Sequence, residues 1–171
     1  MKKNILVICV LLFLSCKEEK KEKINSRPDL KQLIVKVDLK TTTEDVFKVI
    51  MNNIKVDEFQ EKNVIIRETI PVTSNYENIT ASFDTNNFSN NIHIDLGKTL
   101  KNVKFNTIEF IYGANVLLIT KDNFNEFLKV NKFAKFNEDD FSVTTKKEGK
   151  NQYSKIILKQ SAIKFLIKER K

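Results

Sequence analysis

His93 and Asp95 are the two residues whose types could do acid–base chemistry, because an imidazole beside a carboxylate can exchange protons near neutral pH. They lie two residues apart, and His93 is the only histidine of the chain. In the stretch Ile92–Leu96 apolar and polar residues alternate, which predicts a strand with its polar face in water. We therefore expect both side chains to be solvated, and we assign no catalytic residue.

An acidic run at residues 137–140 (Asn-Glu-Asp-Asp) offers the oxygen ligands that calcium prefers. Its spacing fits no known calcium loop, so an acidic turn is the preferred interpretation. The chain also has no pair of histidines for a metal, and its three glycines form no phosphate-binding loop. The sequence therefore predicts neither a metal nor a cofactor.

Tyr76 is the aromatic residue best placed to contact a ligand, because Ser74–Asn78 is typical of a turn and loops present side chains to partners. The chain has no tryptophan, the other aromatic residue common in sugar sites. The preferred interpretation is a ring folded back on the edge of the domain, and Tyr76 is kept as the candidate ligand-binding residue. The phenylalanines are expected in the core, apart from Phe13 near the amino terminus.

Cys16 closes an amino-terminal segment with the three parts of a bacterial secretory signal. Lys2 and Lys3 come first, an apolar run follows over Ile5–Leu14, and the small residue Ser15 precedes the cysteine. The apolar run is too short to span a bilayer core of about 30 Å. An ordinary signal peptide and an amino-terminal membrane helix are the alternatives.

The residues Leu12–Cys16 resemble the lipobox of bacterial lipoproteins, with Phe13 where that family usually has leucine. The resemblance implies that residues 1–15 are a signal peptide removed on export. It also implies that the Cys16 thiol is diacylated and that the new amino terminus is usually acylated as well. Two or three acyl chains give stable membrane anchoring, whereas one gives only marginal binding.

Residues 16–29 are predicted to be the lipidated cysteine and a disordered charged tether, because charges alternate there without apolar periodicity. The tether starts with Lys17, Glu18 and Glu19, which resemble the export signal of surface lipoproteins in the Bacteroidetes. That resemblance implies an outer-membrane protein exposed on the cell surface. The alternative is a solvated spacer on a protein that faces the periplasm.

From Leu30 onward the dominant pattern has a period of two residues, so residues 30–171 are predicted to form one antiparallel β-sandwich. Within Val103–Tyr112 the apolar parity changes, which predicts a bulge at Asn106 or Thr107. Gly113–Asn115 is expected to form a tight hairpin turn. The predicted strands are Leu33–Leu39, Val64–Ile70, Ile79–Phe83, Ile92–Leu96, Val103–Tyr112, Val116–Thr120, Phe141–Thr145, Ile156–Lys159 and Ile163–Ile167.

Two stretches depart from this pattern. Asp122–Val130 places Phe124, Phe127 and Leu128 on one helical face, which predicts one short helix with Asp122 as its N-cap. Thr43–Ile54 fits either a helix capped by Thr43 or a strand. If it is a helix, the domain is α+β rather than all-β.

The order of strand and turn types over residues 79–159 resembles the galactose-binding-like jelly-roll segments of bacterial cell-surface polysaccharide proteins. The residues that carry this resemblance are Ile79–Phe83, Ile92–Gly97, Val103–Ile108, Asn131–Phe133 and Asp140–Phe141. It implies a jelly-roll-like sandwich without an enzymatic role, and it supports that interpretation better than it supports any ligand.

The net charge of +8 does not indicate nucleic-acid binding, because lysines are spread along the chain among acidic residues. The expected function is a lipid-anchored, non-catalytic binding or accessory protein of the outer membrane. Its partners are then the membrane, through the lipid, and a glycan or an envelope protein. The alternative is a structural subunit that docks on a protein complex of the envelope.

Overall fold

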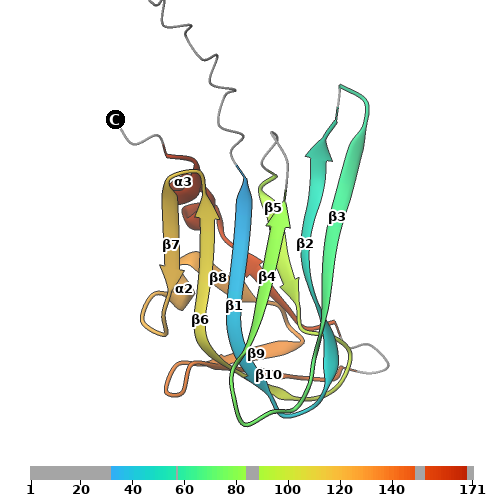
Figure 1. Ribbon diagram of the computed structural model, residues 1–171, viewed down its shortest axis with the longest axis vertical. Helices are drawn as coiled ribbons and strands as arrows, with labels where there is room; N and C mark the ends of the chain where they lie inside the picture. The colour runs from blue at the N-terminus through green and yellow to red at the C-terminus, as the bar shows by residue number, and fades with distance from the viewer. Residues whose placement is uncertain (1–31, 57, 84–88, 149–152, 169–171) are drawn as a thin grey trace, which may run out of the picture.

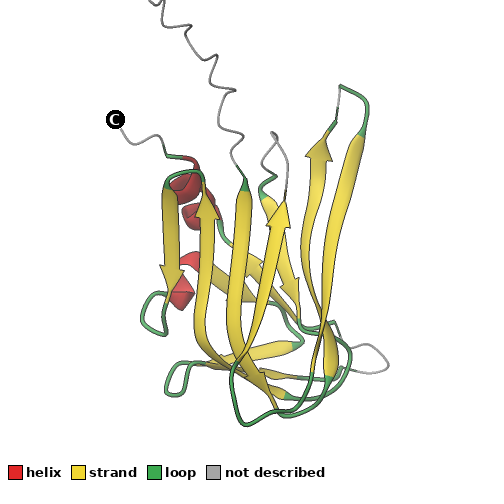
Figure 2. Cartoon of the chain, viewed as in Figure 1, coloured by secondary structure: helices red, strands yellow, loops and turns green. Residues whose placement is uncertain are grey.

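The computed structural model describes residues 32–56, 58–83, 89–148 and 153–168 of the chain. The predicted signal peptide, Cys16, Lys17, Glu18, Glu19 and the tether lie outside the described residues. The described residues form two antiparallel sheets packed face to face, with two helices at one side (Figure 1, Figure 2). The prediction of an all-β sandwich is confirmed.

We name the six-stranded sheet sheet A and the five-stranded sheet sheet B. The path through sheet A is β4 (Glu77–Phe83), β1 (Leu33–Thr41), β6 (Asn102–Tyr112), β10 (Ser142–Thr145) and β9 (Ala134–Asn137), with β7 (Asn115–Ile119) also paired to β6. The path through sheet B is β3 (Glu61–Ile70), β2 (Asp45–Lys55), β5 (Asn91–Asp95), β11 (Lys155–Leu158) and β8 (Leu128–Val130). The helices are α2 (Phe124–Phe127) and α3 (Gln160–Ile167).

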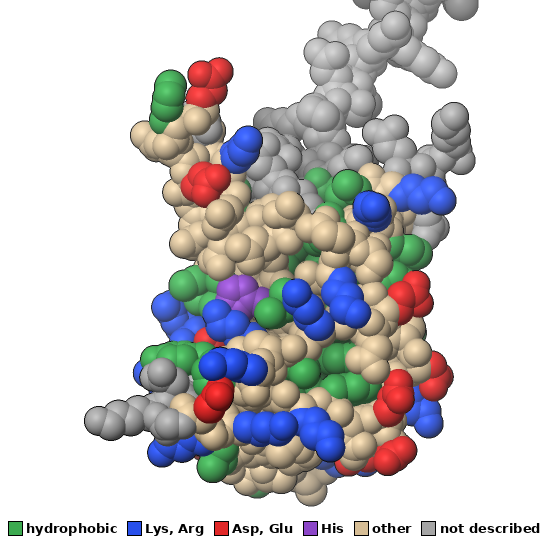
Figure 3. Space-filling model, turned by 180° about the vertical axis from the view of Figure 1, so that it is seen from behind, with side chains coloured by type: hydrophobic (Ala, Val, Ile, Leu, Met, Phe, Trp, Pro, Cys, Tyr) green, Lys and Arg blue, Asp and Glu red, His purple; other side chains and the backbone are tan. Residues whose placement is uncertain are grey.

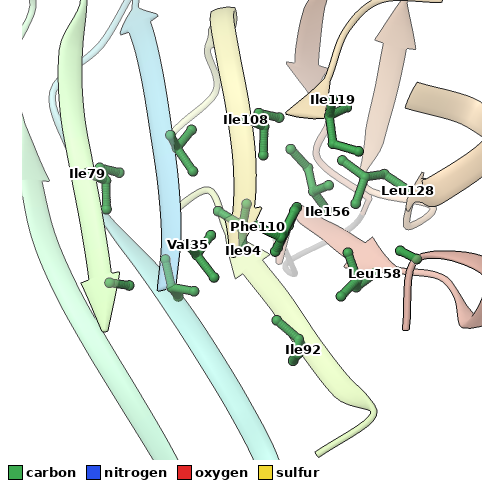
Figure 4. Packing of buried hydrophobic residues seen from close by; sticks show 14 of the residues in the cluster. Val35, Ile79, Ile92, Ile94, Ile108, Phe110, Ile119, Leu128, Ile156 and Leu158 are labelled. Carbon is green, nitrogen blue, oxygen red and sulfur yellow. The ribbon is translucent and has the colours of Figure 1, made fainter. Parts of the chain in front are cut away.

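The core lies between the sheets and is built from the apolar half of each alternating strand. In β1 every second residue from Leu33 to Thr41 is buried, as the period of two predicts. Val35, Ile79 and Phe110 of sheet A face Ile92, Ile94 and Ile156 of sheet B in Figure 4. Burial of these aliphatic and aromatic side chains is the main favourable term in the folding of this domain.

The bulge and the hairpin are confirmed. Asp38 of β1 pairs with Thr107 of β6 and Leu39 pairs with Phe105, so Asn106 is the extra residue. Tyr112 pairs with Asn115, which leaves a two-residue turn that begins at Gly113 with φ 57°. Glycine reaches this left-handed region without steric cost.

The ambiguity at Thr43–Ile54 is settled in favour of a strand, so the α+β alternative is wrong. Thr43 does not cap a helix, because the chain that follows it is strand β2, and its hydroxyl donates a hydrogen bond to the Leu100 carbonyl at 3.3 Å. Asp45 begins β2, which pairs with β3 on one side and β5 on the other. Tertiary pairing therefore overrides the local capping pattern.

The predicted strand at Ile163–Ile167 is also wrong, since Gln160–Ile167 is helix α3. Its buried residues Ala162, Ile163 and Leu166 have helical spacing. The Asn115 side-chain amide donates hydrogen bonds to the carbonyls of Leu166 and Lys168, at 2.8 and 2.7 Å. These contacts satisfy carbonyl groups that the end of a helix leaves without intrahelical partners.

The helix expected over Asp122–Val130 is confirmed only as the four-residue α2, and β8 begins at Leu128. Its N-cap residue is Asn123 rather than Asp122. The Asn123 side chain accepts from the Thr120 N–H at 2.8 Å and donates to the Leu118 carbonyl at 3.0 Å, so it ties the end of β7 to the helix.

Phe59 contradicts the expectation that the phenylalanines after the signal are core residues. It lies between β2 and β3, and 93% of it is exposed. The two strands extend past the neighbouring β5 at this end of the molecule (Figure 1), so Phe59 lies beyond the core that the two sheets enclose.

Candidate functional site

The outer face of sheet B gathers the residues that could carry chemistry. Ile65, Ile50, His93, Ile157 and Lys129 are aligned by the strand register into one row across all five strands. They alternate along their strands with residues of the core, so they point away from it. We call this row the isoleucine row.

A second row lies two residues away from the first on four of these strands. Arg67, Lys48, Asp95 and Lys155 are aligned across β3, β2, β5 and β11. We call it the cationic row. Figure 3 shows this face of the molecule, with the histidine in purple and lysine and arginine side chains around it.

His93 and Asp95 point outward as the alternation predicts, but the expectation that they are solvated is wrong. His93 is 7% exposed and Asp95 is 9% exposed. β5 is the central strand of sheet B, so its outward side chains are surrounded by those of β2 and β11. Lysine side chains on neighbouring strands can lie across such residues with their aliphatic stems while the charged ends stay in water.

The electrostatics of His93 argue against acid–base catalysis at neutral pH. Burial, together with the positive charge of Lys155, lowers the pKa of His93 to about 4, although Asp95 acts in the opposite direction. The imidazole is therefore neutral near pH 7 and has no proton to give as a general acid. The Asp95 carboxylate instead accepts a hydrogen bond from the Gly97 N–H at 2.9 Å, which is a structural role.

His93 predicts an acid-dependent loss of stability. Because the pKa of the folded state lies below the unfolded value of 6.5, the unfolded chain binds the proton more tightly between those two values. The free energy of unfolding should fall from pH 6.5 to about pH 4, by about 3 kcal/mol in total from this residue. Urea unfolding at a series of pH values measures this slope.

The matched variant is His93→Gln, which removes the titrating group and keeps a polar side chain. Its free energy of unfolding should change much less with pH over the same range. Parallel curves for the wild type and the variant would show that His93 is not the source of the acid sensitivity.

Asp45 and Lys101 form an ion pair, and the Lys101 side chain is 0% exposed. The Asp45 carboxylate also accepts hydrogen bonds from the N–H groups of Lys98 and Thr99, both at 2.7 Å, and from the Thr99 hydroxyl at 2.8 Å. Lys101 donates a second hydrogen bond to the Leu96 carbonyl at 2.8 Å and lies over the Phe47 ring. We call this group the Asp45–Lys101 clamp.

The clamp ties together two connections between the sheets. Asp45 follows the link from β1 to β2, and Lys101 ends the link from β5 to β6. Burial alone would raise the pKa of Asp45, but hydrogen bonds from Lys101, Thr99 and Val46 hold it well below its usual range. Burial lowers the pKa of Lys101, and the hydrogen bond with Asp45 offsets part of that effect. The pair therefore closes one end of the sandwich, and its charges have structural partners.

The acidic run at residues 137–140 forms the turn between β9 and β10, as predicted. The Asp140 carboxylate accepts hydrogen bonds from the Asn137 amide at 2.9 Å and from the Ser142 hydroxyl at 2.7 Å. Among the residues that the structure describes, no group of three or more histidine, cysteine, aspartate or glutamate side chains could hold a metal ion.

Tyr76 lies in the connection from β3 to β4 and is half-buried. The Lys40 ammonium lies over its ring, 4.4 Å from the ring centroid, and also donates a hydrogen bond to the Ser74 carbonyl. One face of the ring is therefore already covered by a cation. Tyr76 stays a predicted ligand-binding residue, and it lies apart from the two rows of sheet B.

The described residues include no helix that is long and apolar enough to cross a membrane. Comparison with family models, with curated proteins and with solved structures finds no match to this chain.

Proposed function

We propose that this chain is a lipid-anchored lipoprotein of the outer membrane, exposed on the cell surface, whose β-sandwich binds an envelope glycan without catalysis. The observation that carries the anchor is Cys16, which directly follows Ser15 at the end of the apolar run. Lys17, Glu18 and Glu19 support surface export rather than retention on the periplasmic side.

The use of the charged groups supports a binding role over an enzymatic one. Asp45 and Lys101 neutralise each other within the clamp. His93 is neutral near pH 7 and largely buried. A surface of aligned cations and apolar side chains remains on sheet B, and such a surface suits recognition by contact.

Docking on an envelope protein complex is the second candidate function. Phe59, almost fully exposed between β2 and β3, favours it, because exposed aromatic side chains often anchor protein interfaces. Replacing Phe59 with serine would separate the two functions, since glycan binding should persist while capture of a crosslinked envelope partner should be lost.

Cys16→Ser tests the anchor. The serine hydroxyl does not replace the thiol as the acceptor of the diacylglyceryl group, so labelling by a fatty-acid analogue should be abolished. The variant should also be absent from the outer-membrane fraction, in which the lipidated protein is recovered. It should instead be released from the membrane or be retained as an uncleaved precursor. Labelled Cys16→Ser protein in the outer-membrane fraction would contradict the proposal.

A further inference from the structure

The cationic row carries positive charge that the described residues do not neutralise. Lys48, Arg67 and Lys155 form no ion pair with a described carboxylate, and neither does Lys129 at the end of the isoleucine row. Asp95 is the one carboxylate in the two rows, and the Gly97 N–H occupies one of its oxygens. Within these two rows, four cations therefore accompany one carboxylate.

The geometry of the row is linear. Neighbouring strands lie about 5 Å apart, so Arg67 and Lys48 are adjacent and Lys155 lies about 10 Å beyond Lys48. A row of cations that crosses the strands in this way matches a linear chain of negative charges. The isoleucine row beside it adds the apolar side chains of Ile65 and Ile157, which are partly exposed and can contact the uncharged faces of the same chain.

We propose that the outer face of sheet B binds an acidic polysaccharide through Arg67, Lys48 and Lys155, with the chain lying across the strands and its carboxylates on the cationic row. This inference rests on the proposed function and names the ligand class of the same binding domain. Arg67 can hold a carboxylate through two parallel hydrogen bonds, and the lysines act as point charges.

The outward side chains disfavour other anionic partners. Single-stranded nucleic acid is bound through bases stacked on aromatic rings, and the only ring in the two rows is His93, which is largely buried. A membrane surface is bound by apolar side chains that protrude into it, whereas Ile50 is only 8% exposed and Ile65, on the edge strand β3, is 39% exposed. The cations of this face are therefore best matched by a linear chain that bears carboxylates.

The test measures how tightly the full-length protein, kept in a nonionic detergent, binds two probes. The probes share one backbone and are polygalacturonate and its fully methyl-esterified form. The wild type should bind polygalacturonate, more weakly as salt is added, and should not bind the neutral ester. The triple variant Lys48→Gln, Arg67→Gln, Lys155→Gln should lose affinity by at least about tenfold. Circular dichroism and a melting curve should show that this variant is folded.

The matched control is Lys104→Gln, Lys135→Gln, Lys146→Gln, which removes three exposed lysines in or next to sheet A and lowers the net charge by the same amount. Its affinity should change by no more than about threefold. An equal loss in both triple variants would overturn the site, because the attraction would then depend on total charge alone. Equal binding of the methyl ester would overturn the carboxylate chemistry.

Two further probes separate the other classes of ligand. A single-stranded oligonucleotide or vesicles of phosphatidylglycerol, bound as tightly as polygalacturonate and lost in the sheet B variant, would contradict the acidic polysaccharide. Failure of polygalacturonate binding with normal acylation of Cys16 would refute this inference and leave the anchor standing. Failure of Cys16 acylation with normal polygalacturonate binding would refute the anchor and leave this inference standing.

Discussion

Asp45→Ala should lower the free energy of unfolding by about 3–5 kcal/mol, because it leaves the ammonium group of Lys101 buried without its counter-ion. The Lys101 side chain has no access to water in the folded state. The substitution also removes the acceptor for the N–H groups of Lys98 and Thr99, but these exposed residues can bond to water instead. Urea unfolding near pH 7 measures the change.

The double variant Asp45→Ala, Lys101→Met is the control. Methionine keeps much of the length of lysine and can pack on the Phe47 ring without a charge to desolvate. The double variant should therefore recover part of the stability that Asp45→Ala loses. If it is as unstable as the single variant or less stable, the buried charge is not the cause of the loss.

Gly97→Ala should cause the second largest loss of stability, lowering the free energy of unfolding by about 2–5 kcal/mol. Gly97 has a φ of 85°, where a side chain is strained. A β-carbon at this position would fall within the Asp45 carboxyl group, which its hydrogen bonds hold in place. The alanine must therefore displace Asp45 and weaken the clamp, which urea unfolding would detect.

Gly113→Ala separates backbone strain from this collision. Gly113 also has a positive φ, of 57°, but it lies in the exposed turn between β6 and β7. Its substitution should cost about 1 kcal/mol, the strain component alone. Equal losses at the two glycines would show that contact with Asp45 contributes nothing.

The strands could be predicted because their evidence is local. In β1 and β4, alternation of apolar and polar residues is enough to define both the strand and its buried face. The bulge in β6 was visible as a change of parity in one run of residues. Helix α3 was missed because Ile163, Phe165 and Ile167 also alternate, while the contacts that favour the helix come from β7, about 50 residues earlier in the chain.

The clamp and the two rows of sheet B could not be predicted, since both depend on strand order. Asp45 and Lys101 are 56 residues apart, and nothing in either local sequence indicates the partner. The burial of His93 follows from its place between β2 and β11, which the alternation of β5 alone does not reveal. Gly97, one of only three glycines in the chain, was the one local signal of a close approach near the clamp.

The most direct test of the proposed function is the mass of the amino-terminal peptide of the protein purified from membranes. A lipid-anchored lipoprotein should yield a first residue of Cys16 that carries a diacylglyceryl group, with residues 1–15 absent. An amino terminus that retains residues 1–15, or one that starts at Cys16 or elsewhere without lipid, would contradict the anchor.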